Sequence, residues 1–246
     1  MKRAFKISTN IERDSSAQID YIVTKNTNDV FDKIDFNHSK GQNSFTIIGS
    51  YGTGKSSFLW AFEKHLKGES YFNTGFAKQN TEIDSFNFTR IIGEAISFRT
   101  KFCEVFGLSH LSEGTNKSIL KEFDLLVSEI QEKKIGLVIL VDEFGKHLEF
   151  IAKNNPDEMY FIQELCEYLN DPLKSVLFIT TLHQNVGSYS KGLSKAQRSE
   201  WDKVRGRLLE VTFDEPVEQL LFFASKRLAQ YKPPNIKSFE KLTNQM

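Results

Sequence analysis

The segment from Gly49 to Ser56 has the pattern G-x-x-x-x-G-K-S. An apolar run, Phe45 to Ile48, precedes it, and helical apolar spacing follows it from Lys55. A glycine-rich turn between a strand and a helix presents backbone N–H groups at a helix N-terminus, where they bind phosphate. The pattern therefore predicts a phosphate-binding loop of the Walker A type and requires a strand–loop–helix unit.

Two side chains of this loop have specific expected roles. The Lys55 ammonium would contact the β- and γ-phosphate oxygens of a nucleoside triphosphate, and the Ser56 hydroxyl would ligate Mg²⁺. No Asn-Lys-x-Asp guanine-recognition motif is present in the sequence, so ATP is the expected nucleotide. The predicted nucleotide-binding residues are Gly49, Ser50, Tyr51, Gly52, Thr53, Gly54, Lys55, Ser56 and Ser57.

A run of branched apolar residues from Val138 to Val141 ends in Asp142 and Glu143. A continuous apolar run is typical of a parallel strand that is buried on both faces, and ligands bind at the carboxyl ends of such strands. This is the Walker B pattern, in which Asp142 would hold Mg²⁺. Glu143 could polarise a water for attack on the γ-phosphate, so we expect ATP hydrolysis.

The composition is that of a soluble globular protein. The 246 residues suffice for one α/β domain with an appendage, and 39% are hydrophobic. No apolar run reaches the length of a membrane span, and the basic N-terminus lacks the apolar core of a signal peptide, so we expect no membrane partner and a cytoplasmic location. Cys103 and Cys166 lie in apolar helical stripes and are expected to be buried structural thiols.

The 32 basic residues are balanced by 32 acidic residues, so the chain lacks the overall charge of a dedicated nucleic-acid binder. One local exception is a basic strip between residues 191 and 207. It could bind nucleic acid, an anionic nucleotide or an acidic neighbour. Its basic residues are Lys191, Lys195, Arg198, Lys203, Arg205 and Arg207, which we call the basic strip.

Strand and helix patterns alternate along the chain, which predicts a three-layer α/β/α fold with a parallel sheet of about five strands. The expected strands are 44–48, 70–77, the Walker B run, 175–181 and 208–213. The expected helices are 27–34, 55–66, 88–106, 119–130, one that starts at Asn155-Pro156, 194–204 and one that starts at Pro216. We expect an N-terminal segment (1–43), an ATPase core (44–214) and the start of a helical lid (215–246).

The order of these motifs resembles the AAA+ ATPases and their STAND relatives, within the additional-strand class of P-loop NTPases. This resemblance, over residues 44–228, implies a polar sensor at the end of the strand after Walker B. His183 is the nearest to that position, and Thr181 and Gln184 are alternatives. It also implies an arginine finger that reaches a neighbouring subunit, with Arg205 preferred over Arg207, and hence a homo-oligomer.

The same resemblance implies an adenine contact ahead of the first strand. Tyr21-Ile22-Val23 is the compact apolar cluster there, and a satellite of the core is its alternative role. AAA+ proteins also have a longer helical lid than the residues after Pro216 provide, which suggests that the sequence is part of a longer protein. The sequences around the Walker A and Walker B motifs are similar to those of large bacterial ATP-binding proteins of antiviral defence systems.

These features predict a Mg²⁺-dependent ATPase that serves as the motor or switch module of a larger protein and acts on an effector through conformational change or assembly. The alternative is a DNA-processing ATPase of the initiator or loader type, which would use the basic strip on nucleic acid. Charge balance and the absence of interleaved aromatic residues in the strip favour the switch.

Overall fold

The computed structural model describes residues 9–76, 82–216, 221 and 225. Contacts divide the chain into two units, Met1–Phe213 and Asp214–Met246, and all helices and strands named below lie in the first. The expected lid helix after Pro216 falls outside the described residues, apart from Leu221 and Ser225.

A parallel sheet of five strands forms the centre of the first unit, in the order β2-β3-β4-β1-β5. This confirms the predicted fold class. The Walker A strand, β1, lies between β4 and β5, and β4 separates it from the Walker B strand, β3. The strands are β1 (Ser44–Ile48), β2 (Ser85–Ile92), β3 (Ile135–Asp142), β4 (Val176–Leu182) and β5 (Leu209–Thr212).

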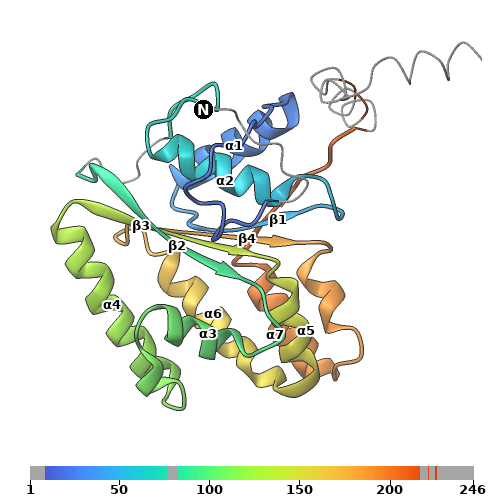
Figure 1. The fold of residues 1–246 in the computed structure, drawn as a ribbon. Helices are drawn as coiled ribbons and strands as arrows, with labels where there is room; N and C mark the ends of the chain where they lie inside the picture. Colours follow the sequence, from blue (N-terminus) through green and yellow to red (C-terminus); the bar gives the residue numbers. More distant parts are fainter. Residues whose placement is uncertain (1–8, 77–81, 217–220, 222–224, 226–246) are drawn as a thin grey trace, which may run out of the picture. The chain divides into compact units, whose positions relative to one another are not determined.

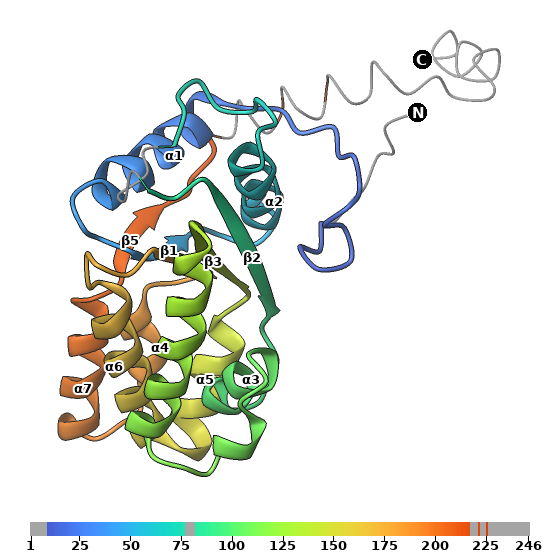
Figure 2. The same ribbon diagram turned by 90° about the vertical axis from the view of Figure 1, so that its left-hand side faces the viewer.

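Helices cover both faces of the sheet (Figures 1 and 2). On one face lie α1 (Lys25–His38) and α2 (Lys55–Leu66). On the other face lie α3 (Phe98–Val105), α4 (Asn116–Glu132), α5 (Gly145–Asn154), α6 (Met159–Leu169) and α7 (Lys195–Arg205).

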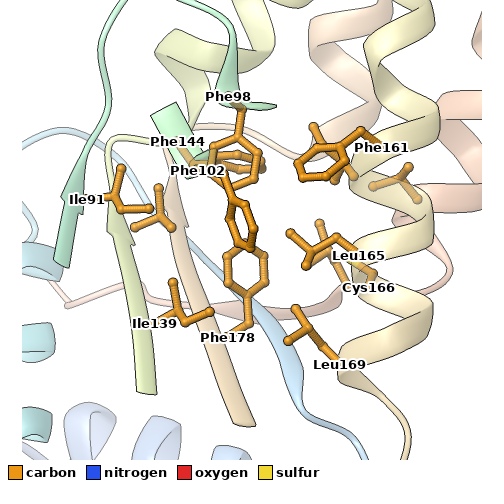
Figure 3. Close-up of a cluster of buried hydrophobic side chains, with 14 of the residues drawn as sticks. Ile91, Phe98, Phe102, Ile139, Phe144, Phe161, Leu165, Cys166, Leu169 and Phe178 are labelled. Carbon is orange, nitrogen blue, oxygen red and sulfur yellow. The ribbon is translucent and has the colours of Figure 1, made fainter. Parts of the chain in front are cut away.

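Each face of the sheet has its own hydrophobic core. Alternate residues of β3 supply both cores, since Val138 and Leu140 pack on the α1/α2 side whereas Ile139 and Val141 pack on the other. The second core is rich in aromatic rings: Figure 3 shows Phe98, Phe144 and Phe178 gathered between the sheet and the helices. A strand that is buried on both faces explains why β3 reads as one apolar run.

Cys103 and Cys166 are buried in this second core, as predicted. Burial raises the pKa of the Cys166 thiol to about 12, which keeps it protonated at neutral pH.

The helix ends follow from local capping chemistry. Ser194 and Gln197 form a capping box at the start of α7, and the Thr115 side chain accepts a hydrogen bond from the Ser118 N–H at the start of α4. At Asn155-Pro156 the prediction was only partly right. Pro156–Glu158 form a 3₁₀ turn, α6 begins after it at Met159, and the Asn155 side chain makes no capping hydrogen bond.

Two other predictions of secondary structure were wrong, and one helix was missed. Residues 70–76 form no strand, and the strand between the two Walker motifs is β2, whose residues 88–92 were assigned to a helix. Phe86 and Phe88 pack against the core on the α2 side, and pairing with β3 extends the backbone. Helix α5, directly after the Walker B acids, was not predicted.

Candidate functional site

The carboxyl ends of β1, β3 and β4 meet at one edge of the sheet. Ile48 is in register with Leu182, and Val141 with Thr180. The residues that follow the three strands are therefore neighbours, although they lie far apart in the sequence. They are the Walker A loop, the Walker B acids and the expected sensor region.

The Walker A loop leads directly into α2. Gly54 is the N-cap of α2 at φ 98°, a left-handed conformation that favours glycine, and Gly52 also has a positive φ of 77°. No side chain caps this helix N-terminus. Helix N-termini bind anions through the N–H groups of the first turn, and the helix dipole favours negative charge there.

The Lys55 side chain folds back over the loop. Its Nζ donates hydrogen bonds to the carbonyl oxygens of Gly49, at 2.5 Å, and Ser50, at 2.7 Å. Lys55 is nearly buried, at 6% exposed. The ammonium thus lies within the concavity of the loop, where a triphosphate would offer it stronger, charged acceptors.

The Thr181 hydroxyl, on β4, forms hydrogen bonds with both Walker B acids. Thr181 Oγ1 donates to Asp142 Oδ1 at 2.6 Å and accepts from the Glu143 N–H at 2.9 Å. Thr181 is 1% exposed. The hydroxyl therefore fixes one oxygen of the Asp142 carboxylate and the backbone of Glu143 at the same time.

A small cavity of about 220 Å³ lies between the loop and the acids. It brings together most of the predicted site: its lining residues are Thr9, Tyr51, Gly52, Gly54, Lys55, Ser56, Ser57, Asp142, Glu143, Thr181 and His183. Gly49, Ser50 and Thr53 belong to the same loop, but they do not line the cavity.

The lining fits a magnesium ion that is bound together with phosphates. Ser56 and Asp142 contribute oxygen atoms. The Glu143 N–H and the Thr181 hydroxyl both donate to Asp142 Oδ1, and neither donates to Oδ2. No group of three His, Cys, Asp or Glu suited to a metal occurs among the described residues. Mg²⁺ needs no such group, because it typically binds through one or two protein ligands, substrate phosphates and water.

His183 lies at the mouth of the cavity, stacked on Tyr51 with ring centroids 3.4 Å apart. Desolvation, followed by the nearby Lys55 charge, lowers the pKa of His183, so the ring is neutral at neutral pH. Two of the three sensor candidates, His183 and Thr181, line the cavity. The third, Gln184, does not. Thr181 makes the direct contacts with the acids.

The N-terminal segment also reaches the site. Thr9 Oγ1 is 2.8 Å from Ser57 Oγ, and the Trp60 indole N–H of α2 donates to the Asp14 carbonyl. Tyr21 and Val23 pack against the core, and the cavity lining includes none of the Tyr21-Ile22-Val23 cluster. For this cluster the structure thus favours the satellite of the core over the base pocket.

Neither arginine of the expected finger lines the cavity. The Arg207 guanidinium forms an ion pair with Glu167 of α6 and donates a hydrogen bond to the Lys203 carbonyl oxygen. Arg205 is freer: its side chain is 55% exposed, and Glu210 Oε1 is 3.8 Å from its Nε.

The basic strip is partly neutralised by its own surroundings. Lys203 pairs with Glu200, and Arg198 donates to the Leu193 carbonyl oxygen. With the ion pairs of Arg205 and Arg207, three of the six cations of the strip have an acidic partner among the described residues, whereas the hydrogen bond of Arg198 leaves its charge uncompensated. Separately, no helix among the described residues is long and apolar enough to cross a membrane.

Two residues of the site escaped the sequence prediction. Thr9 lies 48 residues from Ser57, and no local pattern marks it. Lys146 forms an ion pair with Glu143, at 2.5 Å between Nζ and Oε2. Glu143 lies before α5 and has a φ of 56°, so no helical spacing in the sequence marks this contact.

The sequence matches no protein-family model and no curated protein. Among solved structures, the Aeropyrum pernix ORC2 protein has a TM-score of 0.54 at 12% identity, over 85% of this chain and 54% of that chain. DnaA from Aquifex aeolicus has a TM-score of 0.48 at 16% identity (89% and 57% covered), and C. elegans PCH-2 has 0.44 at 16% (79% and 44% covered).

The chain thus spans about half the length of these three structures. At such identities the similarity concerns the fold alone. The shared fold is a five-stranded parallel sheet between helices, and it is similar to that of the ORC2 protein.

Proposed function

We propose that this chain binds Mg-ATP at the cavity between the Walker A loop and the Walker B acids, and hydrolyses it. One observation carries the proposal: Lys55, Ser56, Asp142 and Glu143, which come from separate segments, line a single cavity at an uncapped helix N-terminus. These are the groups that phosphoryl transfer to water needs.

The proposed mechanism assigns one task to each group. The N–H groups of the loop and the Lys55 ammonium would bind the β- and γ-phosphates, and Ser56 and Asp142 would hold Mg²⁺. When bound, Mg²⁺ neutralises charge on the phosphates. Glu143 would orient a water and take its proton as the water oxygen attacks the γ-phosphorus and the bond to the β-phosphate oxygen breaks.

We further propose that hydrolysis drives a switch or motor in a longer protein. The ORC2 structure, of which this chain covers 54%, supports a role as one module of a longer protein. The sequences around the Walker A and Walker B motifs are similar to those of ATP-binding proteins of bacterial antiviral systems. This similarity supports a role in antiviral defence. The ORC2 structure contains ADPNP and ADP, which supports an adenine nucleotide.

The test combines two variants with a matched control. Lys55→Ala is expected to abolish ATP binding in a nucleotide titration, whereas Glu143→Gln should bind Mg-ATP like the parent but lose turnover. Lys153→Ala, an exposed lysine of α5, should change neither property. ATP binding by Lys55→Ala at parental affinity would refute the phosphate site. Parental turnover in Glu143→Gln would remove Glu143 from the mechanism.

A further inference from the structure

The proposed base is already engaged by a cation of its own chain. Lys146, in the first turn of α5, places its Nζ 2.5 Å from Glu143 Oε2. The hydrogen bond with Glu143 raises the pKa of the Lys146 ammonium above its ordinary value. The charges of Tyr51 and Asp142 raise it further by smaller amounts. The cation therefore lies close to the mouth of the site, although it does not line the cavity.

The backbone around Glu143 is fixed more firmly than its carboxylate. Glu143 has a φ of 56°, which is uncommon for a residue other than glycine. Thr181 fixes this conformation from two sides, because its hydroxyl accepts the Glu143 N–H and its carbonyl oxygen accepts the Phe144 N–H at 3.0 Å. Among the described residues, the contact that holds the Glu143 carboxylate is its ion pair with Lys146.

A carboxylate oxygen that is paired with an ammonium is not available to orient a water. Glu143 Oε2 lies 2.5 Å from Lys146 Nζ, so this oxygen is occupied while the pair is formed. The pair is half-exposed, with side-chain exposures of 53% for Lys146 and 37% for Glu143. Its energy is therefore small enough for a bound triphosphate to break it.

We propose that Lys146 is a positioning residue that holds the Glu143 carboxylate in a resting orientation until Mg-ATP binds, and so limits basal turnover. This inference rests on the proposed role of Glu143 as the base. Release then depends on the nucleotide, because the water that attacks the γ-phosphate competes with Lys146 for the carboxylate. The alternative is an ordinary surface ion pair, which would contribute slightly to stability and leave turnover unchanged.

The first measurement is the steady-state turnover of ATP in three variants. Lys146→Met removes the charge and keeps much of the chain length, so turnover should rise about two- to fivefold at unchanged nucleotide affinity, as expected for release of a half-exposed pair. Lys146→Arg, which preserves the pair, should behave like the parent. Lys153→Met, on the same helix, is the matched control and should also match the parent. Turnover of Lys146→Met no higher than that of the parent would overturn the inference.

The second measurement needs no turnover. Acylation of the Lys146 amine, followed by mass spectrometry, should be slow in the parent and faster in Glu143→Gln or after addition of Mg²⁺ and a non-hydrolysable ATP analogue. Equal labelling in all three samples would overturn the inference even if the chain hydrolyses ATP. By contrast, parental turnover in Glu143→Gln would refute the proposed base while the labelling still reported the ion pair.

Discussion

At the scale of single residues, Thr181 is the side chain on which both Walker B acids depend. Thr181→Val keeps the shape and leaves Asp142 Oδ1 and the Glu143 N–H without their shared partner. Hydrogen bonds to charged groups are worth about 1.5–3 kcal/mol, so turnover should fall about tenfold or more. ATP turnover of the purified variant measures this effect.

Two comparisons isolate the role of this hydroxyl. Thr181→Ser, which retains it, should recover most of the turnover. Thr180→Val removes a buried hydroxyl from the same strand, one that donates only to the Phe45 carbonyl at 3.3 Å, and should affect stability but not turnover. Equal turnover in Thr180→Val and Thr181→Val would exclude a specific role of Thr181.

His38 gives the fold a calculable dependence on pH. Its ring is buried, and its Nδ1–H donates to Asn43 Oδ1, since the Asn43 amide donates to the Leu169 carbonyl oxygen. Desolvation lowers the pKa of His38 to about 4, despite the opposing effect of its hydrogen bonds with Asn43 and with the Gln42 backbone. The unfolded chain therefore binds a proton more readily than the folded chain between about pH 6.5 and pH 4.

The contribution of His38 to stability is full above about pH 6.5 and is lost as the pH falls toward 4. Between pH 7 and pH 4 the free energy of unfolding should drop by about 3 kcal/mol more in the parent than in His38→Gln. Urea unfolding at several pH values measures the difference. Parallel pH profiles of the two proteins would show that His38 titrates normally in the fold.

At the scale of elements, the end of β2 presses against the end of β3. The Gly93 N–H donates to the Asp142 carbonyl oxygen at 2.7 Å, and a Cβ at Gly93 would lie 2.0 Å from the Glu143 carbonyl oxygen. A side chain there would have to displace the backbone of the proposed base. The edge strand therefore takes part in shaping the site, although no β2 residue lines the cavity.

Gly93→Ala is expected to lower turnover more than nucleotide affinity and to cost about 1–3 kcal/mol of stability, as overpacking does. Gly75→Ala is the matched control, because a Cβ at Gly75 would meet no atom within 4 Å. ATPase assays and thermal unfolding of both variants provide the measurement. If Gly93→Ala retained parental turnover, the contact between β2 and β3 would have no bearing on the site.

At the scale of the whole molecule, the two arginines before β5 are expected to behave differently. Arg205→Ala should keep ATP binding and lose turnover if Arg205 reaches the γ-phosphate of a neighbouring copy; such fingers are worth about 10³–10⁵ in rate. Arg207→Ala should instead lower stability, because it removes the ion pair with Glu167. ATPase assays and thermal unfolding distinguish the two outcomes.

Mixing the inactive variants tests the neighbouring copy directly. Arg205→Ala retains a complete Walker site and Glu143→Gln retains Arg205, so a mixture should recover part of the activity. Turnover of the parent should also rise with protein concentration. Activity that is independent of concentration, with no recovery on mixing, would mean that one chain completes the site alone. Stimulation by DNA with a steep salt dependence would instead favour the DNA-processing alternative.

The sequence alone determined the parts of this protein whose chemistry is local in the chain. The Walker A loop needs its glycines, Lys55 and Ser56 side by side, and the bounds of α2 were predicted correctly at both ends. The apolar run of β3 is equally visible in the chain, because a strand that is buried on both faces needs consecutive apolar residues. The fold class followed from the alternation of these patterns.

Tertiary structure decided what depends on distant partners. Residues 88–92 have apolar spacing that suits either a helix or a strand, and pairing with β3 makes them part of β2. Thr181 meets Asp142 across 39 residues, and Thr9 meets Ser57 across 48. Contacts of this kind arise only when parallel strands end at one edge of a sheet, because the energy that fixes them comes from packing between elements and not from the local sequence.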